Sequence, residues 1–232
     1  MLYLVPTPIG NLEDITLRAL RTLREADLIL AEDTRTTGLL LRHYDIHRPL
    51  MAYHKFNEHH AVGPLVERLR AGENIALASD AGTPGISDPG FLIAREALRA
   101  GVEVTCLPGA TALVPAVVAS GLPCERFAFE GFLPQKKGRQ SRLAALAAER
   151  RTMVFYESPH RVVRALQQMS EVFGPGRSVA VCRELTKVHE DIVRGPLSAA
   201  IAHFTEHAPR GEFVIVVAGA DDSPQQSITA TT

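Results

Sequence analysis

The stretch NIALASDAGTPGISDPGFLIA (residues 74–94) joins a short apolar run to a helical pattern through an unusually long turn. Nine of the twelve residues Ser79–Gly90 are Gly, Pro, Asp or Ser, which supply turn conformations. Connections of this kind usually take about two to six residues. The stretch therefore predicts a strand and a helix joined either by a long structural elbow or by a loop shaped around a ligand.

The same order of strand, loop and helix recurs through the first half of the chain. Short apolar runs at Leu2–Val5, Leu28–Ala31, Leu50–Tyr53, Ile75–Ala78 and Val102–Leu107 each precede apolar residues at helical spacing. Such alternation predicts a parallel sheet covered by helices on both faces. We expect residues 1–122 to form an N-terminal α/β domain with a mostly parallel sheet.

The second half breaks this alternation. Ser178–Arg183 and Asp191–Arg194 have the pattern of strands, and only a short polar link separates them. Strands without an intervening helix predict an antiparallel pair. We expect residues 123–220 to form a second α/β domain with a mixed sheet, and the polar residues 221–232 to form a disordered tail.

Composition restricts the class of protein. Hydrophobic residues make up 46% and charged residues 22%, as in ordinary globular proteins, and the net charge is −1. Three cysteines without a CxxC pair predict neither a disulfide framework nor a zinc site, and we expect no metal. Cys106 and Cys182 lie in apolar runs and are expected in the core. The chain shows no signal-peptide pattern and no apolar run of about 18 residues, which predicts a cytoplasmic protein.

Three unusual loops follow strands and should share one edge of the first sheet. They are Pro6–Asn11, Ser79–Gly90 and Pro108–Ala112, and ligands bind at the carboxyl edge of parallel sheets. Neither a P-loop nor a dinucleotide fingerprint is present, and the prolines remove N–H donors that an anion needs. Loops of this kind suit a ligand with a cationic centre, or one with an adenine edge and hydroxyls. Gly and Pro that merely end strands are the alternative.

Three polar segments add candidates. Glu32–Arg35 follows the second strand, where Asp33 or Thr34 is either a helix N-cap or part of a polar site. Tyr156–Arg161 has Ser158 as an expected N-cap, with Pro159 at the first helical position. Arg183–Glu190 is a charged link, which is either a solvated hairpin or a functional segment.

A basic cluster follows Pro134. Its members are Lys136, Lys137, Arg139 and Arg142. A flexible basic loop favours binding of a phosphate backbone, and the alternative is a solvated helix start. Nearby aromatic residues can stack on a base, unless they belong to the core.

Seven motifs in fixed order carry a resemblance to a known family. They are VPTPIGNLEDIT (5–16), AEDTR (31–35), SDAGTPGISDPG (79–90), LPGATAL (107–113), FEGFLP (129–134), FYESPHR (155–161) and RELTKVHE (183–190). Together they resemble the ribosomal RNA small subunit methyltransferase I family, within the tetrapyrrole-methylase-like superfamily. The resemblance covers roughly residues 1–219.

The resemblance implies two α/β domains with S-adenosylmethionine in the cleft between them. It implies 2′-O-methylation of a cytidine ribose in the decoding region of 16S ribosomal RNA, by a homodimer. The opening stretch is then divided: its first half contacts the cofactor, and Asp88 caps the following helix. The family's cofactor contacts correspond here to Pro8, Ile9, Asp80, Ala81, Gly82, Thr83, Thr111, Ala112, Tyr156, Leu185, Gly211 and Glu212.

The implied reaction is an in-line displacement, in which the ribose 2′-oxygen attacks the methyl carbon and the sulfur leaves. A ribose hydroxyl is a poor nucleophile near neutral pH, so a side chain should accept or polarise its proton. The catalytic candidates are Asp33, Glu184 and Lys187. Lys187 acts as a base only if burial or a neighbouring cation lowers its pKa.

The candidates for RNA contact are basic. They are Arg35, Lys136, Lys137, Arg139, Arg142 and Arg161. Two other functions are kept as alternatives. One is methylation of a tetrapyrrole or a protein, and the other is a non-catalytic RNA-binding role in ribosome assembly.

Overall fold

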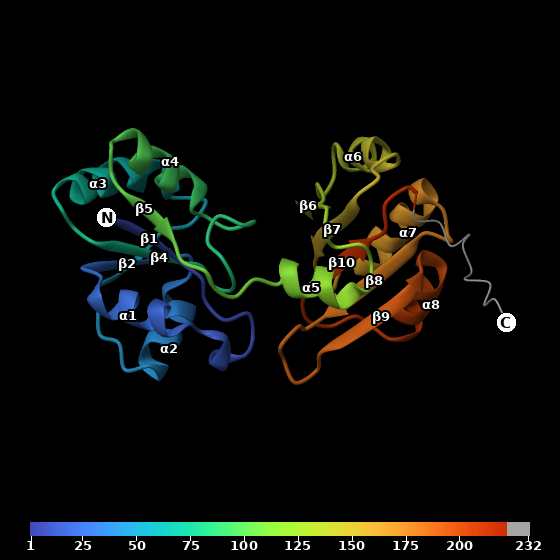
Figure 1. Cartoon of the computed structure of the whole chain (residues 1–232), viewed down its shortest axis with the longest axis horizontal. Coiled ribbons are helices and arrows are strands. Elements are labelled where there is room, and N and C mark those ends of the chain that lie inside the picture. Colours follow the sequence, from blue (N-terminus) through green and yellow to red (C-terminus); the bar gives the residue numbers. More distant parts are fainter. Residues whose placement is uncertain (222–232) are drawn as a thin grey trace. The chain divides into compact units, whose positions relative to one another are not determined.

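The computed structural model describes residues 1–221, which fold into two compact units (Figure 1). The first unit is Met1–Thr111, and the second begins at Ala112. We expected the boundary after residue 122. It lies before α5 (Leu113–Ser120) because that helix contacts strands β8 and β10 of the second unit. Residues 222–232 of the expected disordered tail lie outside the described residues.

The first unit alternates strand and helix. Its elements are β1 (Leu2–Val5), η1 (Leu12–Asp14), α1 (Leu17–Glu25), β2 (Leu28–Ala31), α2 (Thr34–His43), β3 (Leu50–Ala52), α3 (Glu58–Arg70), β4 (Ile75–Ala78), α4 (Phe91–Arg99) and β5 (Val104–Cys106). The strands lie in the order β3-β2-β4-β1-β5, and every pairing is parallel. The predicted parallel sheet is confirmed.

Helices cover both faces of this sheet (Figure 1). Leu30 and Leu77 pack with α3 and α4 on one face. Their neighbours Ile29 and Ala76 pack with α1 and α2 on the other, because successive side chains of a strand alternate between faces. The edge strand β5 lacks one neighbour, and Cys106 is exposed there rather than buried as expected.

The second unit contains a mixed sheet. Its remaining elements are β6 (Phe127–Phe132), α6 (Arg139–Leu146), β7 (Thr152–Glu157), α7 (Val162–Phe173), β8 (Ser178–Arg183), β9 (Asp191–Pro196), α8 (Leu197–Glu206) and β10 (Phe213–Val217). The order is β6-β7-β10-β8-β9, in which β6 and β7 are parallel and the other pairs antiparallel. The predicted antiparallel pair β8–β9 is confirmed.

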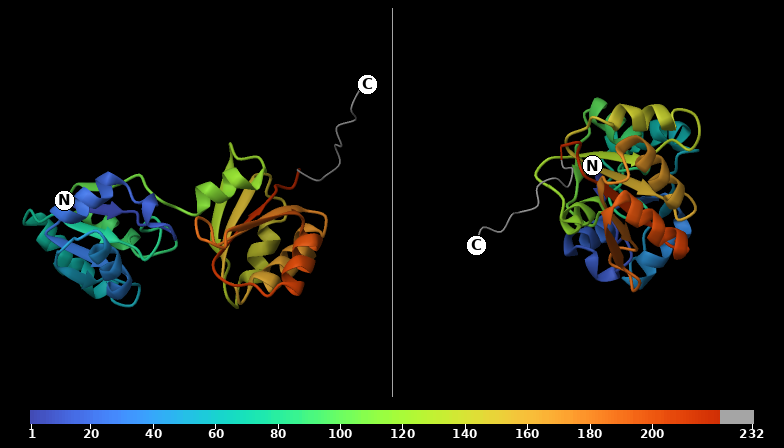
Figure 2. Two further views of the ribbon diagram at one scale, coloured as in Figure 1. Left: turned by 90° about the horizontal axis from the view of Figure 1, so that it is seen from below. Right: turned by 90° about the vertical axis from the view of Figure 1, so that its right-hand side faces the viewer.

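Three helices cover one face of the second sheet, and α5 covers the other (Figure 2). Phe155, Val181 and Ile215 pack into one cluster with side chains of α6, α7 and α8. Cys182 points the opposite way, and its Sγ lies 4.0 Å from the carbonyl oxygen of Ala116 in α5. The second unit therefore has a core independent of the first.

Two expected helix starts differ from the structure. Helix α7 begins at Val162, after a turn in which the carbonyl of Ser158 accepts hydrogen bonds from the N–H groups of Arg161 and Val162. Ser158 is therefore not its N-cap. Helix α4 begins after Gly90, whose φ of +148° and close approach to Gly85 suit only glycine. The expected cap residue Asp88 precedes that position.

Gly109 should be required for the close approach of the loops after β1 and β5. A Cβ atom at this position would lie 2.6 Å from the Pro6 Cβ, and overpacking of this kind costs about 1–3 kcal/mol. We expect Gly109→Ala to lower the free energy of unfolding, measured in urea, by that amount. The control Gly63→Ala meets nothing within 4 Å in α3 and should be neutral or stabilising. Equal stability of the two variants would contradict this account.

Candidate active site

The three loops singled out by the sequence meet at the carboxyl edge of the parallel sheet. Thr7 and Gly82 each donate their N–H to the other's carbonyl, both at 2.9 Å. The Thr83 hydroxyl donates to the carbonyl of Ala110 at 3.1 Å. The expectation that these loops share one edge is confirmed, and hydrogen bonds hold them together there.

The opening stretch is internally fixed. The Ser79 hydroxyl is buried and donates to the carbonyl of Gly82 at 3.1 Å. The Thr7 hydroxyl donates to the carbonyl of Ser79 at 2.9 Å. Gly82 has a φ of +79°, and a Cβ there would lie 3.5 Å from Ile9. The predicted cofactor residues of the first unit therefore converge in these loops: Pro8, Ile9, Asp80, Ala81, Gly82, Thr83 and Thr111.

Two carboxylates stand at the ends of the adjacent strands β2 and β4. Glu32 follows β2 and Asp80 follows β4, and the next helices lie on opposite faces of the sheet. Such a point is where doubly wound sheets bind ligands. The Asp80 carboxylate accepts the N–H of Asp33 at 3.0 Å, and the N–H of Asp80 donates to Glu32. These bonds tie the two loops to each other.

The environment of this pair favours protonation. Partial burial, followed by the charge of Asp80, raises the pKa of Glu32 above its ordinary value. Partial burial also raises the pKa of Asp80, with a smaller contribution from the charge of Asp33. The sequence analysis did not name Glu32 as catalytic. Its position directly after a buried strand was the available signal.

Asp33 is the N-cap of α2, one of the two residues expected there. Its carboxylate accepts the N–H of Arg35 at 2.8 Å and pairs with the Arg35 guanidinium at 2.6 Å. The hydrogen bonds from the Arg35 side chain hold the pKa of Asp33 at about 2. A carboxylate of such low pKa is a poor proton acceptor near neutral pH. The Arg35 side chain is 88% exposed, so its remaining donors are open to solvent.

The second unit carries its own polar group, around Lys187. The ammonium donates to Glu184 Oε1 at 2.8 Å and to Glu212 Oε2 at 2.9 Å. Burial lowers the pKa of Lys187, but the bonds to the two carboxylates outweigh it and leave the pKa above its ordinary value. Burial raises the pKa of Glu184, and the bonds from Lys187 and the Glu212 N–H reverse that effect. Lys187 is therefore an ammonium, and the condition for its acting as a base is not met.

The backbone around this group is strained. Glu184 and Thr186 have φ values of +50° and +68°, which are uncommon for non-glycine residues and more so for a β-branched one. Any Cβ on Gly211 would collide with the Glu184 side chain. Strain of this kind collects at functional segments. The predicted contacts Leu185, Gly211 and Glu212 lie in or beside these segments, whereas Ala112 precedes α5 and Tyr156 packs against Phe129 and Phe132.

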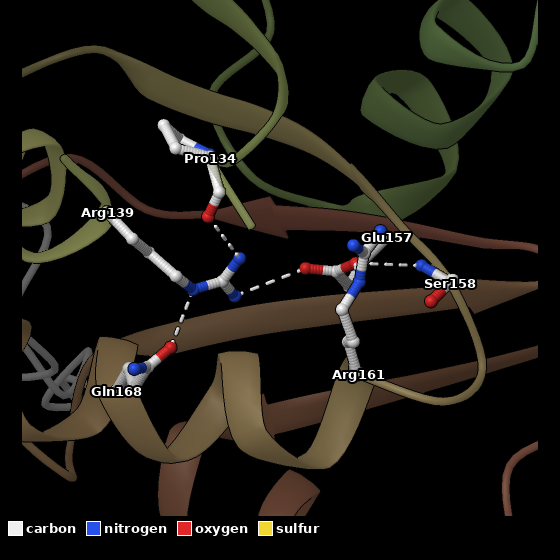
Figure 3. Close-up of polar contacts among 6 residues, drawn as sticks. All are labelled: Pro134, Arg139, Glu157, Ser158, Arg161 and Gln168. Atoms are coloured by element: carbon white, nitrogen blue, oxygen red, sulfur yellow. Dashed lines mark hydrogen bonds and ion pairs between the residues drawn. The ribbon is translucent and has the colours of Figure 1, made fainter. Parts of the chain in front are cut away.

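Arg139 lies in a buried network rather than at the surface (Figure 3). Only 6% of the residue is exposed, and its guanidinium bonds to Glu157 at 3.1 Å, Gln168 at 2.6 Å and the carbonyl of Pro134 at 3.3 Å. Glu157 also pairs with Arg161 at 2.9 Å. Burial of Arg139 contradicts its predicted contact with RNA. Its role is to hold the loop before α6 against β7 and α7.

The other basic candidates divide into paired and unpaired residues. Arg142 pairs with Glu130 at 2.5 Å and remains half-exposed. Lys136 and Lys137 are exposed, and neither has an ion pair within residues 1–221. In the same range no group of three or more His, Cys, Asp and Glu side chains could hold a metal ion. No helix of this range is long and apolar enough to cross a membrane.

Solved structures with the same fold are methyltransferases or related enzymes. A uroporphyrin-III C-methyltransferase from Thermus thermophilus superposes with a TM-score of 0.66 at 24% identity, covering 94% of each chain. A diphthine synthase superposes with a TM-score of 0.71 at 15% identity, covering 94% of this chain and 89% of that one. At such low identity the likeness establishes the fold alone.

Sequence comparison establishes the family. The profile of the Tetrapyrrole (Corrin/Porphyrin) Methylases matches residues 1–201. Proteins named ribosomal RNA small subunit methyltransferase I match with 52% identity in Synechocystis sp., over 99% of this chain and 82% of theirs. They match with 48% identity in Thermotoga maritima, over 94% and 98%. The chain belongs to the tetrapyrrole methylase family and, within it, to the ribosomal RNA small subunit methyltransferase I family.

Arg139→Met should destabilise the second unit strongly, because it leaves Glu157 buried with one partner fewer. Breaking a buried ion pair costs about 3–5 kcal/mol. Lys137→Met removes an exposed charge on the same loop and should change the free energy of unfolding by less than about 0.5 kcal/mol. Urea unfolding of both variants measures the difference. If Arg139→Met were as stable as Lys137→Met, the anchoring role of Arg139 would be wrong.

Glu32→Gln should stabilise the fold in a pH-dependent way. The folded state raises the pKa of Glu32, so its ionised form destabilises the fold above that pKa. The neutral amide removes this penalty at about pH 7, and the gain should disappear at about pH 4, where the glutamate is protonated in both states. Urea unfolding at both pH values tests the sign, with the exposed Glu25→Gln in α1 as control. A gain that grew at low pH would contradict it.

Proposed function

We propose that this chain transfers a methyl group from S-adenosylmethionine to the RNA of the small ribosomal subunit, at the 2′-oxygen of a cytidine ribose in the decoding region. The observation that carries the proposal is the set of three joined loops beside Glu32 and Asp80, in a chain whose relatives at about 50% identity are named as methyltransferases of that RNA. A homodimer is proposed from the motif resemblance.

The residues of the loop edge fit such a cofactor. The N–H groups of Thr7 and Gly82 are used in pairing the loops, so the edge offers carbonyl oxygens and carboxylates rather than an anion cradle. Asp80 and Glu32 suit a cationic centre and sugar hydroxyls. When bound, S-adenosylmethionine supplies a methyl group activated by its sulfonium. In the first unit the holding residues are Pro8, Ile9, Asp80, Ala81, Gly82, Thr83 and Thr111, and contacts of the second unit stay as predicted from the resemblance.

The side chains divide the remaining chemistry. Holding the ribose oxygen in line with the methyl carbon supplies much of the rate, because orientation replaces a bimolecular encounter. Glu32 suits the role of proton acceptor better than Asp33, since its pKa is raised and that of Asp33 is about 2. Asp33 then orients Arg35 toward a phosphate. Lys187, kept protonated by Glu184 and Glu212, polarises an oxygen or holds a phosphate.

The alternatives from the sequence differ in what they bind. A tetrapyrrole or protein substrate is suggested by fold likeness at 15–24% identity. A non-catalytic assembly factor would bind RNA without binding S-adenosylmethionine. Isothermal titration with the cofactor separates the last reading from the other two. Mass spectrometry of the small-subunit RNA after reaction separates the substrates.

Asp80→Asn should weaken cofactor binding. The amide oxygen can still accept the N–H of Asp33, so the loop should keep its shape while the negative charge is lost. We expect the Kd for S-adenosylmethionine, from isothermal titration, to rise at least about tenfold, equal to ~1.4 kcal/mol. Asp88→Asn, in the same loop but assigned no cofactor contact, is the control. Equal Kd values for the two variants would remove Asp80 from the site.

The catalytic residues should be separable by methyl transfer to small-subunit particles. We expect Glu32→Gln and Lys187→Ala each to lower kcat more than about tenfold, with Lys187→Arg recovering part of the loss. Because Glu32 must be ionised to accept a proton, kcat should fall as the pH drops through its pKa in the parent chain. Asp33→Ala and Glu184→Ala should act less directly, through Arg35 and Lys187. If no variant lost more than tenfold, the assignment of these roles would fail.

A further inference from the structure

The second unit contains a pocket between its edge strand β6 and helix α6. The pocket encloses about 480 Å³, within the usual range for small-ligand sites. Phe132, Leu133 and Pro134 form an apolar wall, and Glu130 and Arg142 form a polar one. All of these residues belong to the second unit, and none is among the predicted cofactor contacts.

Phe132 gives the pocket an exposed ring. It ends β6 and is 51% exposed. Its ring centroid lies 5.6 Å from that of Tyr156, which lies 5.0 Å from that of Phe129, both in edge-to-face packing. The two other rings thus hold Phe132 in place without covering it. A fixed, exposed aromatic ring suits stacking on an unpaired base.

The polar wall presents acceptors and donors side by side. Arg142 donates through Nε at 2.9 Å and Nη2 at 2.5 Å to the same oxygen, Glu130 Oε2. Among residues 1–221 no hydrogen bond is formed by the other oxygen, Oε1. The Glu130 side chain is 8% exposed, while that of Arg142 is 52% exposed. A carboxylate next to a guanidinium complements a base edge that carries an amino group beside an acceptor.

The rim of the pocket is basic and anchored. Lys136 and Lys137 lie between Pro134 and Gly138, which both line the pocket. The Arg139 guanidinium donates to the carbonyl of Pro134 and is itself fixed by Gln168 and Glu157 (Figure 3). Two unpaired ammonium groups therefore stand on a loop with a fixed base. Together with Arg142 they outnumber the single carboxylate of Glu130.

We propose that this pocket binds one unpaired nucleotide of single-stranded RNA. Its base stacks on Phe132 and bonds to the Glu130–Arg142 pair, and its phosphates lie at Lys136 and Lys137. The inference rests on the proposed function in taking RNA as the substrate, and it adds a second holding point made by the second unit alone. A base within a duplex cannot enter, because its faces are covered by neighbouring bases.

A fluorescent variant provides a direct test. The chain contains no tryptophan, so Phe132→Trp introduces a single fluorophore that keeps an aromatic face. A short single-stranded RNA of mixed sequence should quench this fluorescence on binding. The same RNA annealed to its complement should quench it far less. Tryptophan at Phe127, on the same strand but outside the pocket, should respond weakly to both.

Equilibrium binding of the same RNA measures the contribution of each wall. Phe132→Ala should raise the Kd about tenfold, and Lys136→Gln with Lys137→Gln should lower the slope of log Kd against log salt by about one. The matched controls are Phe127→Ala and Arg164→Gln, an exposed charge on α7, and both should stay within about twofold. Phe132→Leu, which keeps apolar bulk without a ring, should behave like Phe132→Ala and covers the case that alanine unfolds the strand.

The outcomes separate this inference from the proposed function. Normal methyl transfer with unchanged RNA affinity in the Phe132 and lysine variants would overturn the pocket alone. Quenching by single-stranded RNA in a chain that transfers no methyl group to RNA would overturn the proposed function alone. Lost methylation of particles with unchanged affinity for the RNA would indicate a protein partner, and would also overturn the pocket as an RNA site.

Discussion

Two backbone hydrogen bonds between Thr7 and Gly82 are the constraint on which the first unit's site depends. They join the loop after β1 to the loop after β4, and Thr83 extends the connection to the loop after β5. Parallel strands bring their carboxyl ends to one edge, but they do not by themselves fix the loops there. Because the N–H groups are used in this pairing, the edge is left with carbonyls and carboxylates. That choice of donors and acceptors favours a cationic nucleoside over a phosphate.

A second constraint is the buried carboxylate of Glu157. A buried charge must be paired and hydrogen-bonded, and Arg139, Arg161 and the Ser158 N–H fulfil that requirement. The same bonds fix the loop that carries Lys136 and Lys137. One electrostatic requirement of the core therefore supports a basic rim on the surface.

The site carboxylates illustrate a conflict between stability and chemistry. Burial and mutual repulsion raise the pKa of Glu32, so its ionised form weakens the fold at neutral pH. The same shift makes it a better proton acceptor than Asp33, which Arg35 stabilises in the ionised form. Lys187 shows the reverse arrangement, since two carboxylates keep it charged. Local pairing thus decides which groups can move a proton.

The sequence by itself determined the two α/β domains, the parallel and mixed sheets and the ligand-binding edge. Those features follow from local periodicity and turn residues, and Leu28–Ala31 and Ser178–Arg183 begin and end as the pattern predicted. Tertiary structure alone decided that α5 joins the second unit, that Arg139 is buried, and that Lys187 stays protonated. Burial and pKa depend on partners distant in the sequence, such as Glu157 and Gln168 for Arg139. A basic run has the same pattern whether its side chains face solvent or a buried carboxylate, and only the packed core distinguishes the two.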